Sequence, residues 1–287
     1  MSAASPPRWS LVSFGDGSLG WRNAARRVVR EACPAVEVAD AQAYDLRRLR
    51  RDLPGFWRDH GDFVRLHERG CGYWLWKPYL IRDALRRRGG AGVVYVDAGS
   101  TLRLHTPEAR RRWAEYLALA ADHGLFSFRL GGAEGQWTKP ELLDHLRLRD
   151  SDRCSRQLAA HFLILADRPE TRDLVDAWCD TATAEGYGYL TDRRWRVDGS
   201  DSLVEHRHDQ SIFSCLAKAI GVGCSIDDES WPAGGWDMSD ERCPVWATRW
   251  ASGAPFGTSR RSHLSERIDH RARVALRRGA PLIRIRR

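Results

Sequence analysis

The stretch GCGYWLWKPYLIRDALRRRGGAGVVYVDAGS, residues 70–100, contains the strongest structural signals of this chain. Glycines and aromatic residues lead into Lys77, and apolar residues at helical spacing follow. The run 93–96 is β-branched or aromatic and lies between glycines, which is typical of a fully buried strand. Asp97 follows this run directly and so lies at the carboxyl end of the predicted strand, which is the edge at which open α/β sheets bind ligands. A carboxylate there can hold a metal, a ribose hydroxyl or a sugar hydroxyl, or it can cap a turn before Gly99.

Strand-like and helix-like segments alternate along most of the chain. We expect strands at residues 9–14, 36–38, 93–96, 125–129, 158–165 and 221–228, and helices at 19–32, 44–51, 106–123, 167–185 and 212–220. This alternation predicts an α/β fold with one mixed, mostly parallel central sheet flanked by helices. A chain of 287 residues can bury a sizeable core. We assign residues 1–258 to a single domain and residues 259–287 to a basic C-terminal tail.

The first predicted strand ends in Gly15-Asp16-Gly17-Ser18, and a predicted helix follows. A strand, turn and helix at the start of an α/β chain is the usual place for a nucleotide-binding loop. The turn lacks the GxGxxG pattern. Gly15 and Asp16 are nevertheless candidate substrate-binding residues.

The net charge of +8 belongs to the tail, because residues 260–287 contain ten Arg and two acidic residues and the body is neutral. We therefore expect no nucleic acid bound by the folded domain.

No apolar run approaches the ~20 residues that span a bilayer, and the seven Cys include no C-x-x-C pair. We expect a cytoplasmic protein. Apolar residues at helical spacing in 265–279, surrounded by Arg, predict peripheral contact with the anionic inner face of a membrane; a solvated tail is the alternative.

The chain contains 43 Arg but only three Lys, at positions 77, 139 and 218. A lysine that persists in such a composition can mark a place where a compact ammonium fits and a planar guanidinium does not. Chance is the other explanation. Lys77 and Lys139 both lie in an aromatic context, directly after or close to a tryptophan and before a proline.

A second concentrated motif is HRHDQS, residues 206–211, which directly precedes a predicted apolar helix. Two imidazoles, a carboxylate and an amide within five residues are more than a helix cap requires. We therefore expect some member of this motif to have a function in a site.

Five segments together resemble a group of bacterial glycosyltransferase-like proteins associated with capsule and polysaccharide genes. They are GYWLWKP (72–78), VVYVDAG (93–99), QWTKPELL (136–143), RQLAAHFLIL (156–165) and HRHDQSIFSCL (206–216). The resemblance covers roughly residues 9–227. It implies a GT-A-like domain, in which a nucleotide-sugar donor lies across the carboxyl edge of the central sheet. It also implies transfer of a sugar, of the hexosyltransferase type, to a glycan, lipid-linked or small-molecule acceptor.

The resemblance departs from the GT-A pattern at one point. GT-A enzymes usually carry two acids, D-x-D, that hold Mn²⁺ or Mg²⁺, whereas Gly99 stands here at the position of the second acid. One carboxylate is a poor divalent site unless other ligands join it. Asp97 could bind a metal with help from His206, His208 or Asp209. Alternatively Lys77, Lys139 or Arg207 neutralises the diphosphate and no metal is used.

The resemblance also implies roles for individual residues. We expect Asp209 and His208 to be catalytic at the reacting sugar, and Asp97 to bind the ribose, a metal or the donor sugar. The remaining candidate substrate-binding residues are Gly99, Trp76, Lys77, Lys139, Arg207 and Gln210. Trp74 and Trp76 could stack on a base or sugar, or could pack in the core. The alternative function is a non-catalytic nucleotide- or glycan-binding protein of the same fold.

Overall fold

The computed structural model describes residues 8–88, 90–193, 203–231 and 242–257. Its central sheet has the strand order β2-β1-β3-β6-β5-β7. These strands are β1 (Trp9–Phe14), β2 (Val38–Tyr44), β3 (Gly92–Val96), β5 (Leu125–Ala133), β6 (Arg156–Ala166) and β7 (Cys224–Asp227). β6 pairs antiparallel with both β3 and β5, and the other pairs are parallel. Five strands therefore run in one direction, which confirms the predicted mixed, mostly parallel α/β sheet.

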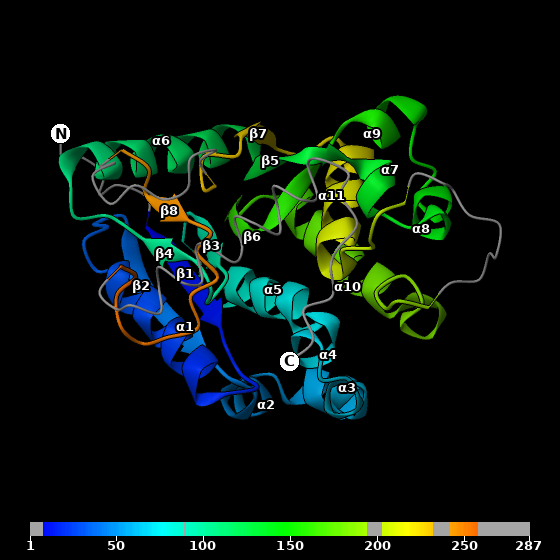
Figure 1. The fold of residues 1–287 in the computed structure, drawn as a ribbon, viewed down its shortest axis with the longest axis horizontal. Helices are drawn as coiled ribbons and strands as arrows, with labels where there is room; N and C mark the ends of the chain where they lie inside the picture. Colours follow the sequence, from blue (N-terminus) through cyan, green and yellow to red (C-terminus); the bar gives the residue numbers. More distant parts are fainter. Residues whose placement is uncertain (1–7, 89, 194–202, 232–241, 258–287) are drawn as a thin grey trace, which may run out of the picture.

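Helices cover both faces of this sheet (Figure 1). One face packs against α5 (Trp76–Arg88), α10 (Pro169–Tyr187) and α11 (His208–Ile220), and the other against α1 (Leu19–Glu31) and α6 (Pro107–His123). The shorter helices are α2 (Leu46–Asp52), α3 (Pro54–Leu66), α4 (Gly70–Tyr73), α7 (Glu134–Trp137), α8 (Pro140–His145) and α9 (Asp150–Cys154). The two faces carry separate apolar cores, as expected for a three-layer α/β domain.

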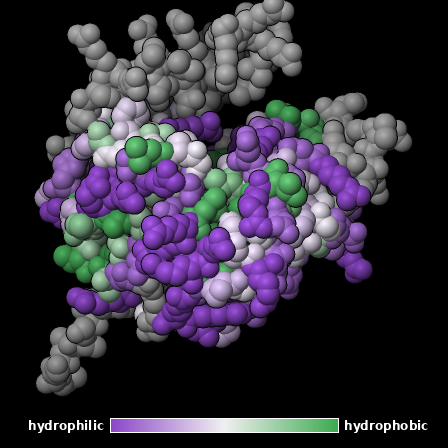
Figure 2. Space-filling view, turned by 90° about the horizontal axis from the view of Figure 1, so that it is seen from below, coloured by the Kyte–Doolittle hydropathy of each residue, from purple (hydrophilic) through white to green (hydrophobic). Residues whose placement is uncertain are grey.

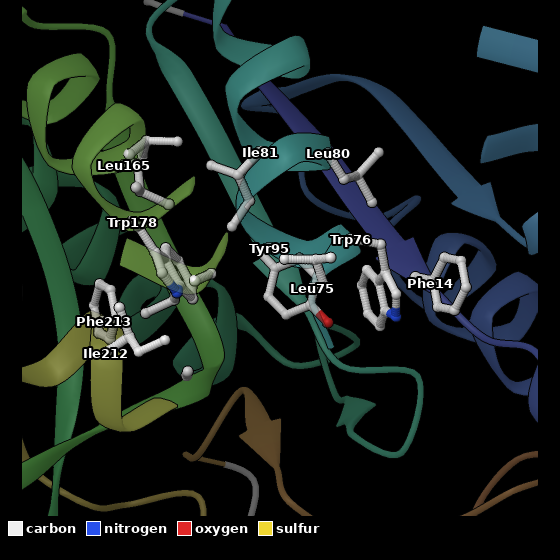
Figure 3. Packing of buried hydrophobic residues seen from close by; sticks show 14 of the residues in the cluster. Phe14, Leu75, Trp76, Leu80, Ile81, Tyr95, Leu165, Trp178, Ile212 and Phe213 are labelled. Carbon is white, nitrogen blue, oxygen red and sulfur yellow. The ribbon is translucent and has the colours of Figure 1, made fainter. Parts of the chain in front are cut away.

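The core nearest the end of β3 is aromatic (Figure 3). Trp76, the first residue of α5, stacks on Phe14 at the end of β1 with ring centroids 3.8 Å apart. Its indole Nε1 donates to the carbonyl of Gly70 at 3.0 Å, and only 3% of the residue is exposed. These contacts support the packing interpretation of Trp76 and leave its ring no surface for stacking on a substrate.

The surface is hydrophilic over most of the face in Figure 2, where hydrophobic residues form smaller separate patches. Many of the abundant arginines are exposed and pair with an acidic residue close by in the sequence, as Arg58 does with Asp59 and Arg65 with Asp62. Such exposed pairs contribute little to stability. The arginine-rich composition of the body therefore does not create a strongly basic face.

Two features of the sheet differ from the sequence-based expectation. The residue range predicted for the second strand, 36–38, is wrong, because β2 begins at Val38 and continues to Tyr44. β2 is an edge strand and is mostly half-buried. Its sequence, VADAQAY, therefore lacks the run of β-branched residues that is typical of a buried strand, and the strand could not be recognised from that pattern. A second small sheet, in which β4 (Thr101–Leu102) pairs with β8 (Val245–Trp246), was not predicted either.

Gly15 follows β1 and packs too tightly for any side chain. Its N–H donates to the carbonyl of Tyr44 at 3.0 Å, and an added Cβ would lie 2.1 Å from the carbonyl oxygen of Trp21. We expect Gly15→Ala to lower the free energy of unfolding by about 1–3 kcal/mol, because the backbone of α1 would have to move. Urea unfolding of the variant measures this.

Gly131→Ala is the matched control, because an added Cβ there would meet nothing within 4 Å. Equal urea midpoints for wild type and Gly15→Ala would show that the turn tolerates a side chain. Close packing against the carbonyl of Trp21 would then not be the reason for a glycine at position 15.

Candidate active site

The centre of the candidate site is the buried ammonium of Lys77. Its Nζ lies 2.6 Å from Asp209 Oδ2 and 3.4 Å from Asp97 Oδ1, and it donates to the carbonyl of Ala160 at 3.1 Å. The ring of Tyr95 lies beneath the ammonium, with its centroid 5.0 Å away. The structure thus brings the acid after β3 and the acid of the HRHDQS motif to one cation, although they are far apart in the sequence.

The chain positions Lys77 by packing the residues that precede it. Trp76 is fixed by Phe14 and Gly70, as described above, and the N–H of Lys77 donates to the carbonyl of Trp74 at 2.9 Å. The first turn of α5 therefore starts from an anchored point. The four-carbon stem of Lys77 then crosses the core, and only 3% of the side chain is exposed.

The charges of this cluster compensate one another. Burial would lower the pKa of Lys77, but the carboxylates of Asp209 and Asp97 outweigh it and raise the pKa above its usual value. Burial raises the pKa of Asp209 to about 6, against the opposing effect of Lys77. Lys77 is therefore charged at neutral pH, and Asp209 changes its charge in the mildly acidic range.

The two acids differ in exposure. The side chain of Asp97 is 34% exposed and that of Asp209 is 7% exposed. Tyr95 donates its hydroxyl to Asp97 Oδ1 at 2.6 Å, and burial raises the pKa of that hydroxyl well above its usual value, so it remains a donor. Asp97 is the carboxylate that can meet a ligand, whereas Asp209 lies in the interior with Lys77.

The turn after Asp97 is held from two directions. The buried guanidinium of Arg27, on α1, donates to the carbonyls of Ala98 at 3.0 Å and Ser100 at 2.6 Å. Thr248 Oγ1 and the N–H of Trp250 donate to the carbonyl of Gly99 at 2.9 and 3.0 Å. These bonds fix the direction in which Asp97 leaves β3.

Gly99 explains the departure from the D-x-D pattern. An added Cβ at this position would lie 3.1 Å from the Cα of Arg249 and 3.3 Å from the ring of Trp21. The segment around Arg249 therefore occupies the space that a second acid would need.

The residues of the site do not fit a resident divalent ion. Gly99 stands in place of a second acid after Asp97, and Asp97 Oδ1 already faces an ammonium and a hydroxyl donor. Within residues 8–88, 90–193, 203–231 and 242–257, no group of three or more His, Cys, Asp or Glu has the geometry of a metal site. The residues expected to complete such a site, His206, His208 and Asp209, have other partners.

The two imidazoles of HRHDQS hold a neighbouring loop. His206 Nε2 donates to the carbonyl of Tyr189 at 2.9 Å, and His208 Nδ1 donates to the carbonyl of Leu190 at 2.9 Å. Burial lowers the pKa of both rings. The catalytic role expected for His208 is not supported by this position, because its ring is 3% exposed and packs between aromatic residues.

Lys77 and Lys139 are buried, Lys218 is partly buried, and all three bind protein oxygens. Lys139 Nζ donates to the carbonyls of Gly188, Thr191 and Arg193. Lys218 Nζ pairs with the buried carboxylate of Glu134 at 2.7 Å and donates to the carbonyl of Arg156 at 3.0 Å. The contacts of Lys139 give it a structural role in place of the phosphate-binding role expected from the sequence. That an arginine would not fit at these positions stays a prediction.

Gln210 and Arg207 are also tied to the protein. Gln210 Oε1 accepts from the N–H of Ala160 at 3.2 Å, and its Nε2 donates to Gln157 at 2.7 Å. The guanidinium of Arg207 lies 3.7 Å from the ring centroid of Trp137, and burial lowers its pKa to about 10. Both positions indicate that these side chains fasten α11 and its approach to the sheet.

Asp16 closes the turn after β1. Its carboxylate accepts from the N–H of Leu46 at 2.7 Å and from the N–H of Gly17 at 2.6 Å. It connects the turn to the start of α2, which is a structural role for a residue expected to bind substrate.

Three further residues at this edge of the sheet were not among the candidates predicted from the sequence: Tyr95, His161 and Asp228. His161 lies on β6 beside the end of β3, since its carbonyl accepts from the N–H of Asp97 at 2.8 Å. The signal for His161 was an imidazole inside the apolar run 158–165. Its neighbours could not be identified without knowing that β6 is antiparallel.

We compared the chain with known proteins by sequence and by structure. No protein-family model matches the sequence, and no curated protein matches it. Three solved chains match in structure. Among them, mouse xyloside xylosyltransferase 1 in its apo form is 10% identical, with a TM-score of 0.43, over 86% of this chain and 100% of that chain.

The predicted tail, residues 259–287, lies outside the described residues. Among the helices that the structure does describe, none has the length and apolar character needed to cross a membrane.

The raised pKa of Asp209 can be tested without a substrate. Because the folded protein binds this proton more tightly than the unfolded chain, the folded state gains stability as the pH falls from about 6 towards 3.8, the range between the two pKa values. We expect the free energy of unfolding of wild type, relative to Asp209→Asn, to increase as the pH is lowered through this range. Urea unfolding at a series of pH values measures it, and parallel curves for the two proteins would contradict it.

Proposed function

We propose that this protein is a glycosyltransferase of GT-A-like fold that takes a sugar from a nucleotide-sugar donor. The observation that carries the proposal is the partly exposed carboxylate of Asp97, fixed at the carboxyl end of β3 by Lys77 and Tyr95. Ligands of open α/β sheets bind at this edge. A carboxylate there can accept hydrogen bonds from the ribose or sugar hydroxyls of a donor.

A leaving nucleoside diphosphate also needs positive charge. Lys77 and Lys139 are fully engaged inside the protein, so neither provides it. Arg249 is exposed and crosses the turn at Gly99, and its charge lowers the pKa of both His161 and Arg207. We assign Arg249 to the phosphates of the donor.

Asp209 and Lys77 have a positioning role in this proposal. Asp209 neutralises Lys77 from the interior, and Lys77 in turn fixes Asp97. The chemistry assigned to the site uses no divalent ion, because the residues present do not fit one. The acceptor is a hydroxyl of a glycan, a lipid-linked sugar or a small molecule, and adsorption of the tail to an anionic membrane would favour the lipid-linked class.

The function is tested by incubating the full chain with UDP-, GDP- and dTDP-sugars and measuring slow hydrolysis of the donor. We expect turnover of one donor class without added metal. Asp97→Asn should weaken binding of that donor about tenfold, because a carboxylate that accepts hydroxyl hydrogen bonds loses its charge. Titration calorimetry with the corresponding nucleoside diphosphate-sugar measures the affinity.

The outcomes separate the two classes of function. Binding of a nucleotide-sugar without any turnover would favour the non-catalytic binding protein. Unchanged affinity in Asp97→Asn would remove Asp97 from the donor site.

Replacing Lys77 by arginine tests the central ammonium. A guanidinium does not fit between Ala160, Tyr95 and two carboxylates, so we expect Lys77→Arg to lower donor turnover by at least about tenfold. Lys218→Arg is the matched control, because Lys218 is another largely enclosed lysine paired with an acid but lies outside the site. Equal losses of turnover in both variants, matched by equal losses of stability, would show that Lys77 acts only through folding.

A further inference from the structure

A chain of three polar side chains leads from the end of β7 to the edge where Asp97 lies. Ser230 Oγ donates to Asp228 Oδ1 at 2.6 Å, and His161 Nε2 lies 3.0 Å from the same Oγ. The N–H of Ser230 also donates to Asp228 Oδ1, at 3.0 Å, and Ser230 is fully buried. The ring of His161 stacks near Phe128, which limits its rotation.

This chain fixes the tautomer of His161. The hydroxyl hydrogen of Ser230 is given to a carboxylate, which can only accept, so Oγ faces His161 with a lone pair. His161 Nε2 must then carry the ring hydrogen, and Nδ1 carries a lone pair. Within the described residues Nδ1 has no hydrogen-bond partner.

The charges around His161 come from four directions. Asp228 follows β7, Asp97 follows β3, Lys77 comes from α5 and Arg249 from the segment after β8. Burial lowers the pKa of His161; Asp228 and Asp97 oppose this effect, and Lys77 and Arg249 add to it. The imidazole is therefore neutral at neutral pH, while two nearby carboxylates can stabilise it after it gains a proton.

We propose that His161 is the proton acceptor of the transfer reaction, oriented by Ser230 and Asp228. This inference rests on the proposed function. The acceptor oxygen forms a bond to the anomeric carbon, the bond from that carbon to the diphosphate oxygen breaks with its electron pair, and the hydroxyl proton moves to His161 Nδ1. A direct displacement of this kind inverts the anomeric configuration. It gives the base role to a residue beside Asp97 instead of to the buried Asp209 or His208.

His161→Gln separates the chemical role from the structural one. The glutamine amide nitrogen can still donate to Ser230, but no acceptor remains in the place of Nδ1. We expect donor hydrolysis to fall at least about 100-fold, as for loss of a general base, with the affinity for UDP, GDP or dTDP unchanged. His123→Gln, at the exposed end of α6, is the control and should keep wild-type turnover.

A second measurement needs no donor. Long-range ¹H–¹⁵N spectra of protein labelled at histidine should show His161 as the neutral Nε2–H tautomer at pH 7, and Ser230→Ala should give a mixture of tautomers. The His161 signal is identified by its absence in His161→Gln. An imidazolium or an Nδ1–H tautomer in the wild type would overturn the proposal whatever the donor.

The kinetic outcomes are also separable. Wild-type turnover in His161→Gln would overturn the role of His161 but not the transferase. Turnover that requires Mn²⁺, is abolished by EDTA and is restored in His161→Gln by more Mn²⁺ would make His161 a metal ligand instead. Absence of turnover with every donor, despite the expected tautomer, would overturn the transferase and the proton acceptor together.

Discussion

The arrangement of the carboxyl edge of the sheet depends on one buried ammonium. Lys77 comes from α5, Asp97 from the end of β3, the carbonyl of Ala160 from β6 and Asp209 from α11. Four elements are thus fastened at one point. Removing one partner of a buried ion pair costs on the order of 3–5 kcal/mol, since the remaining charge stays buried and uncompensated. The same interaction that holds these elements together therefore sets the direction of Asp97.

The reversed strand β6 makes this arrangement possible. The pairing of β5 with β6 shifts in register between Ser127 and Arg129, so the ladder is interrupted beside Ala160. Both backbone groups of Ala160 then bond to side chains: its N–H to Gln210 and its carbonyl to Lys77. A buried backbone group must find a partner. The irregularity in the sheet thus creates the place into which the polar side chains of α5 and α11 reach.

The sequence predicted the parts of this site better than their roles. The strand 93–96, the acid after it and the unusual lysine were identifiable from local pattern and composition. The structure brings Asp97 and Asp209, which the sequence offered as separate candidates, to the same ammonium. The roles of His206, Lys139 and Gln210 could not be predicted from the sequence, because they depend on backbone and side-chain groups that other segments present. His161 was missed for the same reason: an imidazole in an apolar run shows its partners only when the strand direction and the register are known.

The most direct test of the account is a crystal structure of the full chain soaked separately with UDP, GDP and dTDP. We expect one nucleotide to lie at the carboxyl edge of β1 and β3, with a ribose hydroxyl at the Asp97 carboxylate and its phosphates towards Arg249. Lys77 should remain paired with both acids. A nucleotide bound only in the cavity of about 300 Å³ beside β7, which is lined by Arg129, Arg156 and Lys218, would contradict this placement. So would a complex in which Lys77 leaves the two carboxylates to bind phosphate.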